Sequence, residues 1–228
     1  MERMRGLTEK PQAIALQGPP APQKGKPMTC IYNEEDHSYT VDGKRVPSVT
    51  EIVGLLTAGK YQDTNAAMME QAKRRGTAVH ELCELIDCGI DPEELEIPPE
   101  LVGYVNAWLA FLRDYRPEWD YLEKIVCTSE YAGRADRIGT IDGKKCVVDI
   151  KTTANMDRLS KLALYFQLRA YGNAVGGIQT GLGVQLRTNG RYTVHRMEKI
   201  RDNYLQNKNP GILWGGLLEI AKMTGGYE

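Results

Sequence analysis

Two aspartates and a lysine near the middle of the chain have the types and spacing of a metal-dependent hydrolytic site. Asp136 and Asp149 flank the pair Asp142-Gly143, whose residue types favour a two-residue hairpin turn. If this pair forms the turn, Asp136 stands directly opposite Asp149, with Cβ atoms about 4.5–5.5 Å apart. Lys151 then projects from the same face as Asp149, because side chains alternate along a strand.

Two facing carboxylates repel each other, and leaving them unpaired raises the pKa of at least one. A divalent metal ion removes this conflict, and hard oxygen ligands suit Mg²⁺ or Mn²⁺. The neighbouring Lys151 ammonium could then hold or polarise a water molecule. The alternative is an exposed hairpin that carries three solvated charges.

The segments on either side of this hairpin add polar residues to the candidate set. A strand is predicted over 121–128, with the charged Glu123 near its head. Glu123 is either an edge-strand charge that prevents aggregation or another acid directed at the metal. A helix is predicted over 157–175, and its Gln167 and Tyr171 share one face. They could position a phosphate or the attacking water, or satisfy each other.

Upstream of the hairpin, residues 64–87 have a helical pattern that Gly76 interrupts. Thr77 can cap the second half of this pattern, which carries His80. A single histidine on a helix is usually structural, so a ligand role for His80 needs support from the other residues. The basic triplet over 73–75 reads as a solvated helix face.

The N-terminal part divides into a leader and the start of an ordered domain. Residues 1–28 are rich in proline, glutamine and glycine, and we expect a flexible leader without a core. Order is predicted to begin near residue 29, with a small hairpin around Asp42-Gly43. Ser48 and Glu51 form a capping box that predicts a helix start.

The remaining segments complete the pattern of a mixed sheet covered by helices. An acidic loop over 87–99 precedes a helix opened by Pro99 or Glu100, and Asn189-Gly190 marks a third hairpin. A closing helix is predicted over 210–223. Strand, hairpin, helix and further strands describe an α/β (α+β) domain with a central mixed sheet flanked by helices, spanning 29–228.

Composition restricts the class of protein. The 228 residues carry a net charge of −1 and a pI near 6.4, so any DNA contact must come from a local basic groove. There is no apolar run of the roughly 20 residues that cross a bilayer, and no secretory signal, so we expect a cytoplasmic protein without membrane contact. The five cysteines lack a Cys-x-x-Cys pair, which argues against structural zinc and disulfides.

Taken in order, the chemistry-bearing segments resemble the PD-(D/E)XK nuclease superfamily, in its RecB-like, phage-type exonuclease branch. The likeness covers about residues 30–200. The chain is also similar to the mitochondrial genome-maintenance exonuclease, including a Pro-Ser-Val-Thr segment at 47–50. The matching segments are Gly76-Thr77-Ala78-Val79-His80, Glu123, Gly133-x-x-Asp136, Asp149-Ile150-Lys151-Thr152 and Gln167-x-x-x-Tyr171. The resemblance implies a restriction-endonuclease-like core.

The resemblance also implies a role for each matching residue. The metal ligands would be His80, Asp136, Asp149 and the main-chain carbonyl of Ile150. Glu123 would support the metal or its water, and Glu130 is a less suitable competitor because it lies only three residues before the Gly-x-x-Asp motif. The remaining catalytic roles would fall to Lys151, which orients the nucleophilic water, and to Gln167 and Tyr171, which position DNA and steady the Asp-x-Lys strand.

The activity implied is that of a Mg²⁺- or Mn²⁺-dependent DNA exonuclease of phage or bacterial recombination and repair, in a bacterial or phage-infected cell. The alternatives are a structure-specific endonuclease and a non-catalytic DNA-binding module. The partners would be DNA and a single-strand annealing or single-strand binding protein. Helices over 64–115 could build either a homo-oligomeric ring or a helical arch. The cysteines do not match an iron–sulfur set, and no ATP phosphate loop is present. One metal or two remains open.

Overall fold

The structure is a computed structural model that describes residues 28–61 and 65–227. The leader predicted over 1–28 lies, apart from its last residue, outside the described residues, so the domain boundaries stay a prediction. The strands are β1 (Cys30–Asn33), β2 (Ser38–Val41), β3 (Lys44–Val46), β4 (Glu118–Cys127), β5 (Ala132–Ile141), β6 (Lys144–Lys151), β7 (Thr180–Leu186) and β8 (Tyr192–Arg196). The helices are α1 (Val49–Gly54), α2 (Ala66–Asp87), α3 (Val102–Tyr115), α4 (Arg158–Val175), α5 (Met197–Tyr204) and α6 (Pro210–Gly225), with 3-10 turns at Ala58–Tyr61 and Pro92–Glu94.

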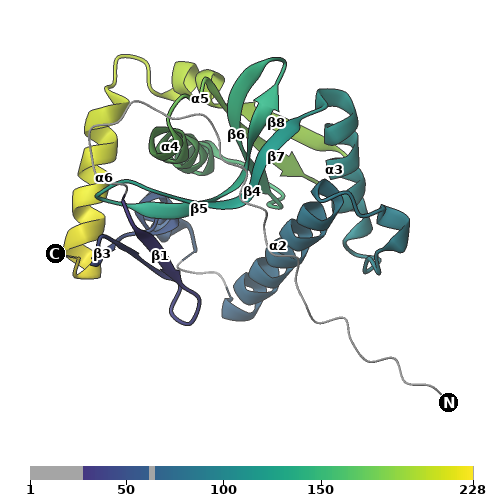
Figure 1. Cartoon of the computed structure of the whole chain (residues 1–228), viewed down its shortest axis with the longest axis horizontal. Helices are drawn as coiled ribbons and strands as arrows, with labels where there is room; N and C mark the ends of the chain where they lie inside the picture. Colours follow the sequence, from purple (N-terminus) through teal and green to yellow (C-terminus); the bar gives the residue numbers. More distant parts are fainter. Residues whose placement is uncertain (1–27, 62–64, 228) are drawn as a thin grey trace.

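The larger sheet has five strands in the order β4-β5-β6-β7-β8. All its neighbours are antiparallel except β6 and β7, which run parallel and are joined through α4. Figure 1 shows α4 against one face of this sheet, and α2 and α3 on the other side. The predicted mixed sheet flanked by helices is therefore confirmed.

Apolar residues fill both faces of the sheet, because side chains alternate along each strand. On β6, Val147 belongs to the core shared with α4, whereas Val148 belongs to the core shared with α2 and α3. Trp108 and Phe111 of α3 are fully buried in the second core. Burying each such side chain contributes roughly 1.5–3 kcal/mol, so the two cores hold the sheet in place between the helices.

The hairpin of β5 and β6 has the register that the sequence predicts. Asp142 and Gly143 adopt φ angles of 51° and 72°, as a two-residue turn with two left-handed positions requires. The pairs run from Ile141–Lys144 to Arg137–Val148. At the next position the ladder opens, and the Ile150 N–H donates to Asp136 Oδ2 at 2.7 Å.

The smaller sheet, β1-β2-β3, is antiparallel and lies beside β5. Its β2–β3 turn uses Asp42 and Gly43 at φ angles of 49° and 81°, which confirms the predicted hairpin. Tyr39 packs in a small cluster with Ala132 at the start of β5. This contact places one face of the small sheet next to the strand that carries Asp136.

The helices agree with the sequence in most places. Ser48 and Glu51 form the predicted capping box at α1. The predicted interruption of the second helix at Gly76-Thr77 is wrong: α2 is continuous and is capped by Asn65. A glycine inside a helix costs about 1 kcal/mol, which tertiary packing of the following turns offsets. The helix predicted from Pro99 or Glu100 begins slightly later, at Val102.

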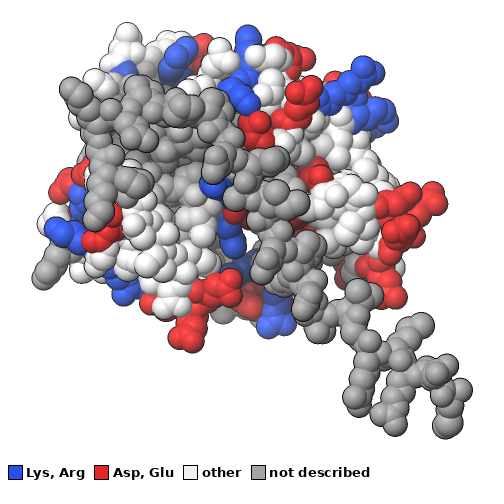
Figure 2. Space-filling view, viewed as in Figure 1, with Lys and Arg blue, Asp and Glu red and all other residues white. Residues whose placement is uncertain are grey.

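Charges of both signs are distributed over the visible surface. Figure 2 shows acidic side chains gathered over the segment between α2 and α3, while Lys and Arg alternate with acids elsewhere on that face. Among the helices described, none combines the length and apolar character needed to span a bilayer. A polyanion would therefore have to be recognised at a local site.

Candidate active site

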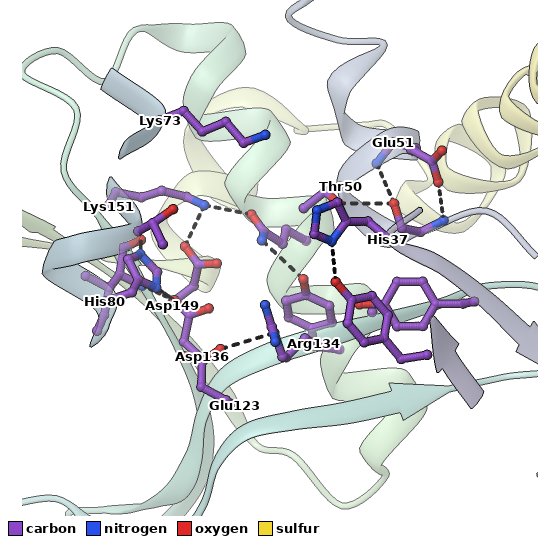
Figure 3. A pocket seen from close by; sticks show the side chains of 18 of the residues that line it. His37, Thr50, Glu51, Lys73, His80, Glu123, Arg134, Asp136, Asp149 and Lys151 are labelled. Carbon is purple, nitrogen blue, oxygen red and sulfur yellow. Dashed lines mark hydrogen bonds and ion pairs between the residues drawn. The ribbon is translucent and has the colours of Figure 1, made fainter. Parts of the chain in front are cut away.

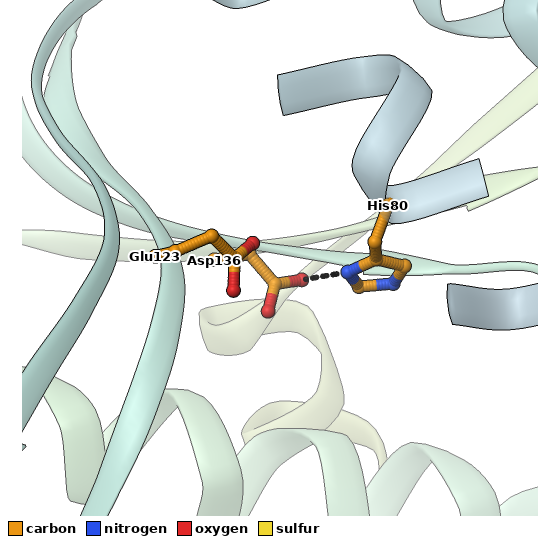
Figure 4. A group of neighbouring side chains, drawn as sticks. All are labelled: His80, Glu123 and Asp136. Atoms are coloured by element: carbon orange, nitrogen blue, oxygen red, sulfur yellow. Dashed lines mark ion pairs between the residues drawn. The ribbon is translucent and has the colours of Figure 1, made fainter. Parts of the chain in front are cut away.

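Three side chains from three elements meet at the open end of the β5–β6 ladder. His80 of α2, Glu123 of β4 and Asp136 of β5 each offer a ligand atom, and these atoms all lie within 4.8 Å of one another (Figure 4). Glu123 lies opposite Asp136 because its neighbours Leu122 and Lys124 pair with the residues flanking Asp136. This group could hold a metal ion.

The contacts of His80 with Ile150 and Asp136 bear on whether this group can bind a metal ion. His80 Nε2 lies 3.1 Å from the carbonyl oxygen of Ile150, which can only accept, so Nε2 carries the proton. In neutral His80 the Nδ1 lone pair then faces Asp136 Oδ2 at 3.5 Å. Two acceptors facing each other need a cation between them or a second proton on the imidazole. The donor set thus fits a divalent metal.

A second chain of contacts leads from Asp149 to α4. The Lys151 ammonium lies 2.8 Å from Asp149 Oδ2 and donates to Gln167 Oε1 at 3.0 Å. Gln167 Nε2 in turn donates to the Tyr171 hydroxyl at 3.3 Å. Asp149 is 1% exposed and pairs with the lysine, so its carboxylate is engaged by Lys151 rather than grouped with His80. These successive contacts fix the direction in which the Lys151 ammonium points.

Gly133, three residues before Asp136, allows β5 to lie close to Tyr171 of α4. A Cβ on Gly133 would lie 2.8 Å from Cε1 of the buried Tyr171 ring. Any larger residue would force the Tyr171 ring to move where β5 passes α4, so the glycine of the Gly-x-x-Asp motif has a steric cause.

Two acids at the site, Glu123 and Asp149, have raised pKa values. Burial, together with the negative charge of Asp136, raises the pKa of Glu123 to about 7, against the opposing charge of Arg137. Burial also raises the pKa of Asp149 above its usual range, although the Lys151 ammonium opposes this. Burial tends to lower the pKa of Lys151, but Asp149 and Asp136 raise it above its ordinary value. The ammonium is charged at neutral pH, and a metal ion would displace protons from the carboxyls.

A buried network behind Glu123 is absent from the sequence prediction. The Arg137 guanidinium, which is fully buried, contacts Asp87 Oδ2 at 2.6 Å, Glu123 Oε1 at 3.0 Å and the Asp136 carbonyl at 2.7 Å. The indole N–H groups of Trp108 and Trp119 both donate to Asp87 Oδ1 at 3.2 Å. Glu123 is thus held by the Arg137 guanidinium, which Asp87 fixes in turn. Arg137 and Asp87 lie 50 residues apart in the sequence, so no local pattern indicates their contact.

Arg134 is a second residue that the sequence did not identify. Its Nε lies 3.4 Å from Glu123 Oε2, on the cavity side of the carboxylate. Glu130, the competitor for the role of Glu123, instead pairs with Lys222 at 3.1 Å and is exposed. The geometry therefore favours Glu123.

The site opens into a cavity of about 920 Å³. All eight residues that the sequence singles out line this cavity: His80, Glu123, Asp136, Asp149, Ile150, Lys151, Gln167 and Tyr171. Lys73 of α2 also lines the cavity, and Figure 3 shows it above Lys151. Residues from β1, the β1–β2 turn, β2 and the start of α1 also line the cavity, and Figure 3 shows His37 and Thr50 across from His80 and Asp149.

Comparisons with known proteins give only remote likeness. No protein-family model and no curated protein matches the chain. Among solved structures, SSO0001 is 16% identical with a TM-score of 0.32, over 72% of this chain and 77% of that chain. An alkaline exonuclease (LHK-Exo) from Laribacter hongkongensis is 12% identical with a TM-score of 0.32, over 78% and 90%. LHK-Exo in complex with dAMP gives 12% and 0.34, over 79% and 93%. These values are too low to bear on function, which rests on the site.

Proposed function

We propose that this chain is a Mg²⁺- or Mn²⁺-dependent DNA exonuclease of the PD-(D/E)XK type, of the RecB-like, phage-type branch. The observation that carries the proposal is the convergence of His80, Glu123 and Asp136 beside the Asp149–Lys151 pair on one cavity wall. Acidic ligands beside a fixed ammonium suit the hydrolysis of a phosphodiester, whose reaction needs both a neutralised phosphate and an oriented water.

The metal would be held by His80, Asp136, Asp149 and the Ile150 carbonyl, with Glu123 beside it. When bound, a divalent cation supplies Lewis acidity toward the phosphoryl oxygens and makes water more acidic. Asp149 would then be shared between the cation and the Lys151 ammonium, which lies 2.8 Å from its Oδ2.

Lys151 would orient the attacking water toward phosphorus. Its Nζ is already fixed by Gln167, and Gln167 is fixed by Tyr171. Gln167 and Tyr171 lie one turn apart on α4, so a rigid helix maintains this direction. Such positioning lowers the entropic part of the barrier.

The test is the degradation of end-labelled DNA in single- and double-stranded form, linear and circular, with Mg²⁺ or EDTA. We expect the linear forms to be shortened from their ends only with Mg²⁺, and Lys151→Ala to lose this activity while keeping its circular dichroism spectrum. Lys145→Ala is the matched control, because Lys145 lies on the same strand but pairs with Asp120 at 2.6 Å.

Each alternative has a distinct result. Cleavage of closed circles would indicate an endonuclease, and DNA binding without cleavage would indicate a non-catalytic module. Unchanged activity of Lys151→Ala would contradict the mechanism. A role in phage or bacterial recombination, with an annealing or single-strand binding protein as partner, is part of the same proposal.

A further inference from the structure

The wall of the cavity that faces the acidic cluster has no role in the hydrolysis described above. It is formed in part by Tyr32 of β1, His37 of the β1–β2 turn and Tyr39 of β2. We call these three residues the aromatic wall. The cavity volume of about 920 Å³ exceeds what a metal ion and one phosphate occupy, so a larger part of a substrate can enter between the two walls.

Tyr32 is the central member of the aromatic wall, and its neighbours fix its ring. The Tyr32 hydroxyl and His37 Nδ1 are hydrogen-bonded at 2.6 Å. The ring centroid of Tyr32 lies 4.8 Å from that of Tyr39, at an interplanar angle of 38°. Both rings line the cavity, but Tyr39 is buried and supports the half-buried Tyr32 from behind.

Arg134 connects the aromatic wall with the acidic cluster. Its guanidinium carbon lies 5.5 Å from the Tyr32 ring centroid, and its Nε lies 3.4 Å from Glu123 Oε2. Figure 3 shows Arg134 between the acids and His37. The same cavity therefore holds a tyrosine ring and an arginine plane next to a candidate metal ligand.

Aromatic rings and guanidinium planes are the surfaces on which unpaired nucleobases stack. A phosphate needs charge and hydrogen-bond donors but gains nothing from a flat apolar ring. In a duplex the faces of the bases are covered by their neighbours, so only an unpaired or terminal base offers a free face.

We propose that Tyr32, together with Arg134, forms a subsite for an unpaired nucleobase of the DNA strand whose phosphate lies at the acidic cluster. The inference rests on the proposed function and adds a substrate preference to it: a single-stranded or frayed end fits, whereas a blunt duplex must first unpair.

The test measures binding without cleavage. A fluorescein-labelled single-stranded oligonucleotide is titrated with the full-length Lys151→Ala chain in Mg²⁺, and its anisotropy is recorded. A second oligonucleotide has the same length and charge but carries abasic residues at its free end. We expect the abasic oligonucleotide to bind about tenfold more weakly, as the loss of one stacked base predicts.

Variants locate the effect. In the Lys151→Ala background, Tyr32→Ala should weaken binding of the normal oligonucleotide about tenfold and leave the abasic one unchanged. Tyr32→Phe keeps the ring and should bind like the parent. Tyr121→Ala is the matched control, because Lys124 lies 4.5 Å above the Tyr121 ring and this ring does not line the cavity.

Equal binding of both oligonucleotides by the parent would overturn the subsite and leave the nuclease proposal intact. Equal weakening of both by Tyr32→Ala would do the same. If Tyr32→Ala fails to fold, the comparison of the two oligonucleotides on the parent decides alone. Binding of neither oligonucleotide, with no degradation by the unsubstituted chain, would contradict the proposed function and the subsite together.

Discussion

Replacement of Arg137 by methionine tests whether the buried network behind Glu123 holds the site together. The guanidinium makes ion pairs at 2.6 Å with Asp87 and at 3.0 Å with Glu123, and it is fully buried. Methionine replaces the aliphatic part of the side chain but removes the only cation that pairs with Asp87 among the ion pairs described, whereas Glu123 keeps its contact with Arg134 at 3.4 Å. Removal of one partner from a buried ion pair typically costs 3–5 kcal/mol, because the remaining charge stays desolvated.

Two features of the network reduce the expected loss of free energy of unfolding. Asp87 keeps its hydrogen bonds from the Trp108 and Trp119 indoles, and Glu123 is partly open to the cavity. We therefore expect a loss near the lower end, about 3 kcal/mol in the free energy of unfolding. For a chain of this size such a loss lowers the melting temperature by about 6–12 °C. In the Arg137→Met variant burial and the lost cation both raise the pKa of Asp87, so the deficit should shrink as the pH falls toward 4.

Urea unfolding, followed by tryptophan fluorescence and by circular dichroism, measures this loss. Arg201→Met is the matched control, because its pair with Asp202 at 2.9 Å is exposed to solvent and should contribute little to stability. The double variant Asp87→Asn/Arg137→Met should recover part of the loss, since no buried charge remains at Asp87. The reasoning would be refuted if Arg137→Met lost less than about 1 kcal/mol in the free energy of unfolding, while the fluorescence and circular dichroism of the native state stayed as in the parent protein.

Three further outcomes follow from the site. Because burial raises the pKa of Glu123 to about 7 and that of Asp149 above its usual value, the stability these groups contribute is complete below about pH 4 and lost as the pH rises to 7. The melting temperature in EDTA should fall between pH 5 and pH 8, and Mg²⁺ should reverse this; a flat profile would count against the shifts. Asp136→Asn should weaken Mn²⁺ binding at least about tenfold in calorimetry, and equal affinity would exclude Asp136 as a ligand. Gly133→Ala should cost about 1–3 kcal/mol by forcing the Tyr171 ring to move, and a wild-type denaturation midpoint would contradict the close contact.

Local chemistry explains what could be predicted from the sequence. Asp142-Gly143 determines the turn, the turn determines the register, and the register holds up to the Arg137–Val148 pair. The same reasoning failed at Gly76, because helix propensity is a weak preference that packing of the later turns of α2 overrides. The roles assigned to the site residues stay predictions, although the structure gathers these residues around one cavity.

Long-range contacts explain what could not be predicted. Asp87 ended a predicted helix and began an acidic loop, and nothing in its neighbourhood indicates an arginine 50 residues away. Arg134 is one of the two unspecified residues of the Gly133-x-x-Asp136 motif, and its contact with Tyr32 spans two sheets. The helix α5 (Met197–Tyr204) was not predicted at all, because its eight residues are shorter than the stretch of about 11–18 residues over which apolar periodicity can be judged.

The site residues differ in how far apart they lie in the sequence, and this difference affects the order in which they meet during folding. The hairpin closes through a two-residue turn, so Asp136 and Asp149 approach each other early, whereas His80 reaches Ile150 across 70 residues of sequence. A ligand set completed only after the rate-limiting barrier adds stability to the native state alone. A bound cation should therefore slow unfolding and leave the refolding rate nearly unchanged.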